Sequence, residues 1–170
     1  MKRLTLVRHA NAEWKDASIP DFDRPLNKRG IGEAEAIGKL LMEHELVPDL
    51  ILTSTARRTQ QTSEIIARML GLPARRVKSA EPLYLARAEV ILALAQATGP
   101  KVEHLAIVGH NPGISELTRL IGPTDATLAE LSTGCACTLT FTVPSWAELA
   151  APASRAVLYG PPARLFKLFS

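Results

Sequence analysis

The segment that decides the fold is residues 4–10, LTLVRHA, near the start of the chain. Its apolar part, Leu4 to Val7, is too short for a helix and ends at the polar pair Arg8 and His9, which is typical of a buried strand. Two later runs have the same form, Leu50 to Leu52 and Leu105 to Val108. The sequence therefore predicts three short buried strands, each followed by polar, turn-prone residues.

Helical patterns lie between and after these strands, with apolar residues three or four positions apart. The expected helices are Gly30 to Leu46, Thr55 to Leu70, Glu89 to Thr98 and Pro112 to Ile121. Asn111 is the expected N-cap of the last helix, with Pro112 at its first position. Strands that alternate with helices predict an α/β fold, a three-layer α/β/α sandwich with a mainly parallel central sheet.

The last part of the chain has a different pattern. Cys135 to Val143 alternates loosely, and Arg155 to Tyr159 is another short strand candidate. Both are expected to be edge or late-added strands, and the tail from Ala163 to Ser170 is expected to dock on the body through its apolar residues. Because 170 residues is close to the length of one domain and no linker stands out, residues 1–170 are predicted to form a single domain.

Composition and charge argue against several classes of protein. Basic residues are scattered and only 5% of residues are aromatic, whereas nucleic-acid-binding surfaces combine a basic stripe with stacking rings. The start of the chain does not resemble a signal peptide, and no apolar stretch approaches the roughly 20 residues that span a bilayer. We therefore expect a cytoplasmic, monomeric protein that binds neither nucleic acid nor membranes, with Cys135 and Cys137 as free thiols.

Polar residues follow each predicted strand at its carboxyl end. They are Arg8 and His9 after the first, Ser54, Arg57 and Arg58 after the second, and Gly109, His110 and Asn111 after the third. If the strands are parallel neighbours, these residues converge on one crevice, which is where ligands bind in open α/β sheets. The planar fork of arginine fits tetrahedral oxyanions, so the pattern predicts a pocket for one phosphoryl group.

The histidines indicate phosphoryl transfer, because a phosphate binder needs no histidine. A neutral imidazole is a nucleophile, and nearby arginines favour its neutral form by like-charge repulsion. The expected mechanism is attack of one histidine on phosphorus, followed by hydrolysis of the phosphohistidine intermediate to inorganic phosphate. Neither His9 nor His110 has the spacing of a zinc motif, so no metal or cofactor is expected.

Three motifs in this order resemble those of the histidine phosphatase (phosphoglycerate-mutase-like) superfamily. Residues 6–10, LVRHA, resemble its Arg-His-Gly signature, Ser54 to Thr62 resembles its Ser-x-x-x-Arg-x-x-x-Thr segment, and residues 108–111, VGHN, resemble the segment with its second histidine. The small size, the alanine in place of the signature glycine, and residues 23–30, DRPLNKRG, are most similar to the SixA-type phosphohistidine phosphatases. The resemblance covers residue 3 to about residue 143 and implies a phosphoglycerate-mutase-like fold.

The resemblance also implies roles for individual residues. His9 is implied to be the nucleophile that becomes phosphorylated. Arg8 and Arg58 are implied to clamp the phosphate, and His110 to donate to the phosphoryl oxygens.

Three further polar residues lie next to the motif residues, namely Arg57, Asn11 and Asn111. Arg58, and not its neighbour Arg57, keeps the family spacing of four from Ser54. Asn11 and Asn111 are candidates for phosphate or substrate binding, although Asn11 fits a turn equally well.

The general acid is the motif in which the chain departs from the superfamily. Many members carry a glutamate before the third helix, but alignment on Leu83 places Pro82 there and Glu81 one residue away. Glu81 is therefore a candidate acid, with a plain loop carboxylate as the alternative. An alcohol leaving group gains roughly 10²–10⁴-fold from protonation, whereas imidazole leaving from phosphohistidine needs much less help. The departure favours a phosphoramidate substrate.

The function expected from the sequence is that of a phosphatase acting on phosphohistidine of a signalling or phosphorelay protein. A small-molecule phosphomonoesterase is the first alternative, and it requires a working acid such as Glu81. A noncatalytic phosphohistidine-binding module is the second, and it predicts binding without turnover.

Overall fold

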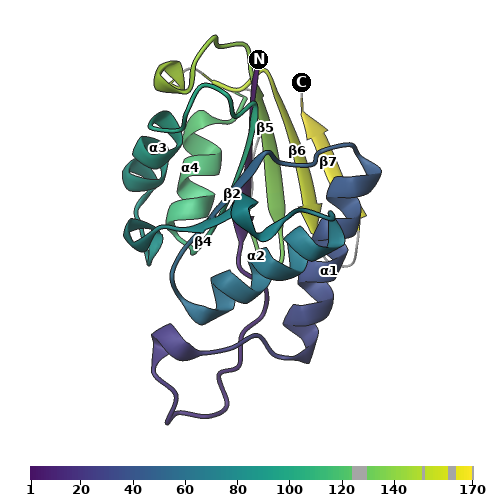
Figure 1. Cartoon of the computed structure of the whole chain (residues 1–170), viewed down its shortest axis with the longest axis vertical. Helices are drawn as coiled ribbons and strands as arrows, with labels where there is room; N and C mark the ends of the chain where they lie inside the picture. The colour runs from purple at the N-terminus through teal and green to yellow at the C-terminus, as the bar shows by residue number, and fades with distance from the viewer. Residues whose placement is uncertain (124–129, 151, 161–163, 170) are drawn as a thin grey trace.

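In the residues that the computed structural model describes, 1–123, 130–150, 152–160 and 164–169, seven strands form one sheet (Figure 1). The strands are β1 (Lys2–Arg8), β2 (Leu50–Thr53), β3 (Val77–Ser79), β4 (His104–Gly109), β5 (Ala136–Phe141), β6 (Arg155–Gly160) and β7 (Arg164–Phe169). Their order across the sheet is β3-β2-β4-β1-β5-β6-β7. The first four strands in this order pair in parallel, and the last three add in antiparallel fashion.

The three strands predicted from the apolar runs are neighbours, with β4 between β1 and β2. Arg8 lies opposite Gly109, and Thr53 lies opposite Val108, so the three strands end almost level. The predicted convergence of their carboxyl ends is therefore confirmed, and the polar residues that follow them share one edge of the sheet.

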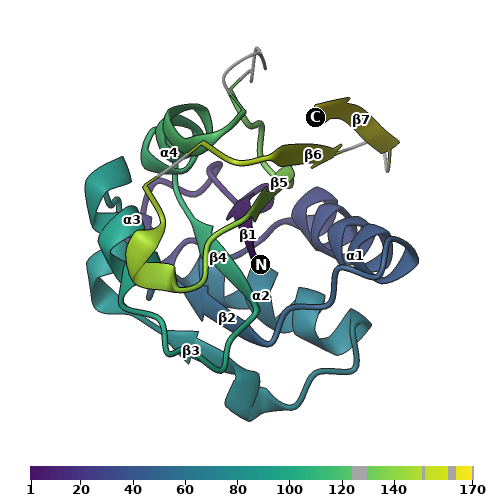
Figure 2. The ribbon, with the colours of Figure 1, turned by 90° about the horizontal axis from the view of Figure 1, so that it is seen from above.

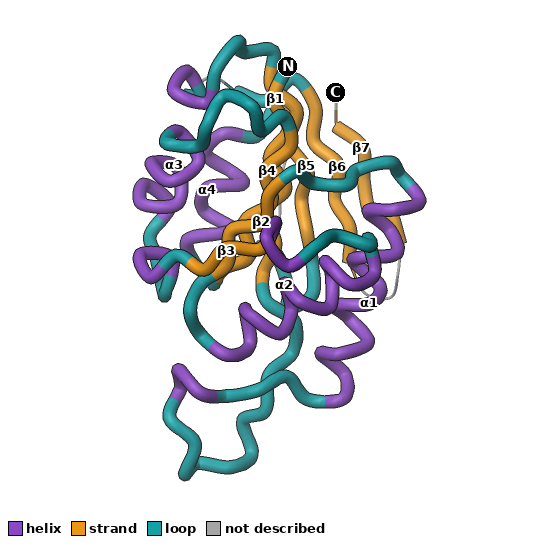
Figure 3. The backbone as a smooth tube through the Cα atoms, viewed as in Figure 1, coloured by secondary structure: helices purple, strands orange, loops and turns teal. Residues whose placement is uncertain are grey.

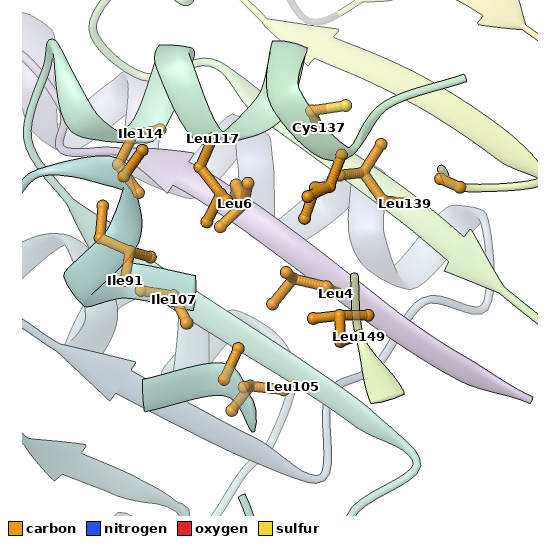
Figure 4. Close-up of a cluster of buried hydrophobic side chains, with 14 of the residues drawn as sticks. Leu4, Leu6, Ile91, Leu105, Ile107, Ile114, Leu117, Cys137, Leu139 and Leu149 are labelled. Atoms are coloured by element: carbon orange, nitrogen blue, oxygen red, sulfur yellow. The ribbon is translucent and has the colours of Figure 1, made fainter. Parts of the chain in front are cut away.

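Helices cover both faces of the sheet, as Figure 2 shows. They are α1 (Lys28–Glu43), α2 (Arg57–Met69), α3 (Ala88–Gln96) and α4 (Gly113–Ile121). Successive strand residues point to opposite faces, so Leu4 and Leu6 pack into a cluster with Ile114 and Leu117 of α4 (Figure 4), whereas Val7 packs into the cluster under α1 and α2. The predicted three-layer sandwich is confirmed. Within the described ranges, no helix is both long and apolar enough to cross a membrane.

Several element boundaries differ from those predicted. α1 begins two residues before the predicted Gly30, because the side chain of Asn27 accepts a hydrogen bond from the Gly30 N–H and caps the helix. α4 begins at Gly113, so its N-cap is Pro112, and Asn111 lies one residue before the cap. The described part of the tail that was expected to dock on the body is strand β7, which pairs with β6. Both cysteines are buried and free, as predicted.

The first turn of α1 lies directly against the backbone that follows His9. A Cβ atom at Gly30 would overlap the carbonyl oxygen of Asn11. We therefore expect Gly30→Ala to lower the free energy of unfolding by about 1–3 kcal/mol, because the helix must shift away from residue 11. Chemical denaturation of the wild type and the variant measures this difference.

Gly32→Ala is a matched control in the same helix, because a Cβ atom there meets nothing within 4 Å. Alanine forms helix more readily than glycine, so this variant should gain about 0.5–1 kcal/mol of stability. Destabilisation of similar size in both variants would contradict the close approach of α1 to Asn11.

Candidate active site

The central position of β4 brings the motif segments of this chain to one place. The backbone N–H of His9 donates to the carbonyl of Gly109 at 3.0 Å, and the N–H of Ser54 donates to the carbonyl of Val108 at 3.1 Å. The strand that carries His110 at its end is thus flanked on one side by His9 and on the other by Ser54. The two imidazole rings lie with their centroids 5.3 Å apart.

The side chain of His9 is oriented by the residue next to it. Its Nδ1 lies 2.8 Å from the carbonyl oxygen of Ala10, and since a carbonyl can only accept, Nδ1 carries the proton and donates. The lone pair is then on Nε2, which lies 3.4 Å from Nε of Arg58. Burial lowers the pKa of His9 to about 4, against the hydrogen bond with Ala10, and the charges of Arg58 and Arg8 lower it further. His9 is therefore a neutral imidazole at neutral pH with its Nε2 lone pair toward a cation.

His110 is buried and is held from both sides. Its Nδ1 lies 3.3 Å from Nη2 of Arg58, which can only donate, so Nδ1 accepts. The proton is then on Nε2, which donates to Oγ of Ser54 at 2.8 Å. Burial and then the charge of Arg58 lower the pKa of His110 to about 3. Both histidines are thus neutral, and their free and protonated nitrogens are fixed by neighbouring groups.

Arg58 is the residue that links the two histidines. It lies in the first turn of α2 and is only 2% exposed, whereas Arg57 is exposed, so the spacing of four from Ser54 selects the arginine inside the site. One turn later, Oγ1 of Thr62 donates to the carbonyl of Arg58 at 2.7 Å and accepts from the N–H of Ala10 at 3.1 Å. The residue after His9 is therefore tied to the same helix that carries Arg58.

Arg8 lies at the end of β1 and is partly buried. Its Nη1 donates to the carbonyl of Leu131 at 2.9 Å. In the described part of the chain, its Nε is buried without a hydrogen-bond partner. Because an unpaired buried donor is costly, this N–H is suited to donate to an anionic ligand.

Asp21 and Tyr84 belong to the site but were not predicted. Asp21 lies in a short 3-10 turn, Asp21–Asp23, and its carboxylate accepts from Nη2 of Arg58 at 3.1 Å and from Oη of Tyr84 at 2.9 Å. Although desolvation raises the pKa of Asp21, the hydrogen bond from Tyr84 and the charge of Arg58 lower it to about 2. The ring of Tyr84 also contacts His110 edge-on, with centroids 5.6 Å apart. The only signal in the sequence is an acidic residue just before the DRPL stretch.

The two candidate asparagines hold neighbouring backbone segments. Oδ1 of Asn11 accepts from Nδ2 of Asn27 at 2.6 Å, which ties residue 11 to the cap of α1. Nδ2 of Asn111 donates to the carbonyl of Leu131 at 2.9 Å, and its Oδ1 accepts from Ser115 at 2.7 Å. The structure therefore places both amides in contacts that fix loops beside the histidines.

Glu81 lies outside the group formed by the histidines and Arg58. It is exposed, in the short 3-10 helix Glu81–Leu83, and lines a surface hollow together with Phe22, Thr55, Pro82 and Tyr84. Among the described residues, no cluster of three or more His, Cys, Asp or Glu side chains could hold a metal ion. The groups gathered at this edge of the sheet are two imidazoles, two guanidinium groups and the carboxylate of Asp21.

Comparison with known proteins identifies the family. A family model described as the histidine phosphatase superfamily (branch 1) matches residues 4–80. An uncharacterized protein of Mycobacterium tuberculosis is 38% identical over 127 residues, which cover 73% of this chain and 77% of that protein. An uncharacterized chloroplastic protein of Arabidopsis thaliana is 30% identical over 128 residues, and the match spans 59% of its length and 71% of this chain.

Solved structures similar to this chain extend the match to nearly its full length. The provisionally named phosphohistidine phosphatase SixA of Nakamurella multipartitia superposes with a TM-score of 0.77 and 27% identity, covering 99% of this chain and 95% of that chain. The provisionally named SixA of Agrobacterium tumefaciens gives a TM-score of 0.72 and 30% identity, covering 99% and 98%. With its motifs placed as described above, the chain belongs to branch 1 of the histidine phosphatase superfamily.

Proposed function

We propose that this protein is a phosphatase that hydrolyses phosphohistidine on another protein through a covalent intermediate on His9. The observation that carries the proposal is the orientation of His9, whose Nδ1 is bound to the carbonyl of Ala10 and whose Nε2 lone pair faces Arg58. This is the arrangement that a nucleophile needs beside a bound phosphoryl group. The similarity to the two SixA structures over nearly the whole chain supports the choice of substrate.

In the proposed reaction, the Nε2 lone pair of His9 forms a bond to phosphorus while the bond to the leaving group breaks. Arg58 and Arg8 supply positive charge for the phosphoryl oxygens, and preorganised charge of this kind usually contributes most of the rate enhancement. The negative charge of a bound phosphoryl group offsets the positive charge of Arg58, which otherwise lowers the pKa of His110. Substrate binding therefore favours the protonated imidazole of His110, in which both ring nitrogens can donate. Water then attacks the phosphohistidine at His9 and releases inorganic phosphate.

The position of Glu81 supports phosphohistidine over an ordinary phosphate ester. An ester needs a proton on its leaving oxygen, but Glu81 is exposed in the hollow that Tyr84 also lines, and in the described residues its side chain makes no hydrogen bond with His9, His110 or Arg58. A small-molecule phosphomonoesterase is therefore the second candidate. A noncatalytic binding module is the third, and the lone pair of His9 beside Arg58 argues against it.

A direct test of the activity removes the proposed nucleophile, His9. Wild type should release phosphate from a phosphohistidine-bearing protein domain well above the rate for an aryl phosphate, and His9→Ala should lose at least about 10³-fold of that rate, because the covalent step is gone. Phosphate release at matched protein concentrations measures both rates.

His44→Ala is the control for loss of an imidazole. Because His44 is exposed at the end of α1, its replacement should leave the rate unchanged. Turnover of the aryl ester alone would assign the protein to the small-molecule phosphatases. Phosphate binding without turnover of either substrate would identify a binding module.

The pH dependence of the rate should report the buried environment of His9. Because the attacking form of His9 is neutral and burial lowers its pKa to about 4, lowering the pH from 7 to 5 leaves the nucleophile unprotonated. After correction for titration of the substrate, kcat/KM should hold over this range and fall only near pH 4. An acid limb near pH 6.5, the value of an unperturbed histidine, would contradict the environment described for His9.

Replacement of Glu81 separates the two enzymatic candidates. Glu81→Gln should leave phosphohistidine turnover within about twofold of wild type, since imidazole needs little help from an acid. Glu89→Gln, an exposed glutamate of α3, is the matched control. A loss of tenfold or more for Glu81→Gln on both kinds of substrate, without a loss for Glu89→Gln, would make Glu81 the general acid.

A further inference from the structure

Asp21 places a carboxylate against the arginine that is proposed to hold the phosphoryl group. Oδ2 of Asp21 accepts from Nη2 of Arg58 at 3.1 Å, and its main-chain oxygen accepts from Nη1 of the same guanidinium. The other carboxylate oxygen, Oδ1, accepts from Nε of Arg24 at 3.1 Å and from its Nη2 at 2.8 Å. The fork of Arg58, which is suited to bind an anion, is thus occupied by an anion of the protein itself.

The connection between β1 and α1 holds this carboxylate at the mouth of the site. Figure 3 shows the connection as a loop with a short helical turn, beyond the carboxyl ends of the strands. The side chain of Asp21 is 49% exposed and that of Arg58 is 2% exposed, so the carboxylate lies between a buried guanidinium and solvent. Tyr84 holds it from a second side, with its ring packed edge-on between Phe22 and His110. A phosphoryl group that reaches Arg58 therefore brings its leaving group close to this carboxylate.

We propose that Asp21 is the residue that determines which leaving groups the site accepts, favouring one that carries an N–H, as imidazole does, over one that leaves as an anion. This inference deepens the phosphohistidine phosphatase activity proposed above and rests on it. It concerns a side chain that the superfamily motifs in this sequence do not include.

The charge of Asp21 decides the direction of the preference. With its pKa near 2, the carboxylate is ionised at neutral pH and has no proton to give to a leaving oxygen. A fixed negative charge repels a developing alkoxide or phenoxide and attracts a cationic N–H. Asp21 therefore raises the barrier for an ester and lowers it for a protonated phosphoimidazole.

The chemical step balances for such a substrate. In phosphohistidine the phosphoryl group is on one ring nitrogen, and the second ring nitrogen binds a proton, which the carboxylate of Asp21 stabilises. As Nε2 of His9 bonds to phosphorus, the electron pair of the breaking P–N bond stays on the first nitrogen. The leaving group departs as neutral imidazole with its N–H intact, so no further proton donor is required.

A second consequence concerns inorganic phosphate, the product. Phosphate and the carboxylate of Asp21 compete for the same N–H groups of Arg58, so removal of the negative charge should tighten phosphate binding. A residue that only holds Arg58 in place would have the opposite effect, because its loss would misplace the guanidinium and weaken phosphate binding. The sign of the change therefore separates the two roles.

The test compares Asp21→Asn with Asp23→Asn. Asparagine keeps the size of the side chain, and Asp23 is an exposed residue of the same short turn, so both variants lose one negative charge in one segment. Steady-state kcat/KM is measured on N-phosphoimidazole, which leaves as imidazole, and on p-nitrophenyl phosphate, which leaves as a phenolate anion. Inorganic phosphate is then titrated as an inhibitor, and thermal unfolding checks that each variant is folded.

For Asp21→Asn we expect the ratio of kcat/KM for phosphoimidazole over the aryl ester to fall about tenfold or more, and the inhibition constant of phosphate to fall about threefold or more. Asp23→Asn should change neither by more than about twofold, because in the described residues Arg58 donates to Asp21 and not to the side chain of Asp23, whose exposed charge is screened. An unchanged ratio, an equal loss on both substrates, weaker phosphate binding, or the same shift in Asp23→Asn would each overturn the role of Asp21.

Failure of the proposed function has a different signature. A wild-type protein that hydrolyses neither N-phosphoimidazole nor a phosphohistidine domain overturns the proposed activity, and the preference assigned to Asp21 falls with it. A wild-type protein that is active on both, with the ratio unchanged in Asp21→Asn, retains the activity and overturns only the role of Asp21.

Discussion

The guanidinium of Arg58 is almost completely buried and cannot lose its proton, so its N–H groups require acceptors inside the protein. Nε2 of His9, Nδ1 of His110 and two oxygens of Asp21 supply them. These acceptors come from the end of β1, from the loop that follows it before α1, and from the end of β4, which lies much later in the sequence. Satisfying one buried cation therefore determines how three separate segments meet.

Burial and the same cation together determine the protonation state of the site. Burial disfavours a charged imidazole, and the charge of Arg58 adds to this effect, so the pKa values of His9 and His110 are about 4 and 3. Neutral imidazoles need one nitrogen to donate and one to accept. The carbonyl of Ala10 and the hydroxyl of Ser54 accept hydrogen bonds from the N–H groups of the two rings, which leaves the lone pairs toward Arg58. The orientation of the Nε2 lone pair of His9 thus follows from its contacts with Ala10 and Arg58.

Much of this arrangement could be predicted from local sequence. The runs at Leu4, Leu50 and Leu105 predict β1, β2 and β4, because short apolar runs bounded by polar residues are distinctive. The three-residue strand β3 gives too short a pattern to recognise, and β7 resembles a docking tail in sequence because its pairing with β6 is a tertiary contact. For the site, the spacing of four from Ser54 selects the buried Arg58 over the exposed Arg57.

Strand pattern and motif spacing are local properties. The sequence alone was therefore enough to predict the layered α/β fold, to identify the family, and to predict that His9, Arg58 and His110 meet at one edge of the sheet. Two contacts of the site could be found only in the tertiary structure. Asp21 contacts Arg58, 37 residues away, and Tyr84 contacts Asp21, 63 residues away. The hydrogen bond from Asn111 to Leu131 is of the same kind. The path of a loop depends on contacts between distant segments that no local pattern records. The same holds for the free nitrogen of His110, whose partners Arg58 and Ser54 are 52 and 56 residues away.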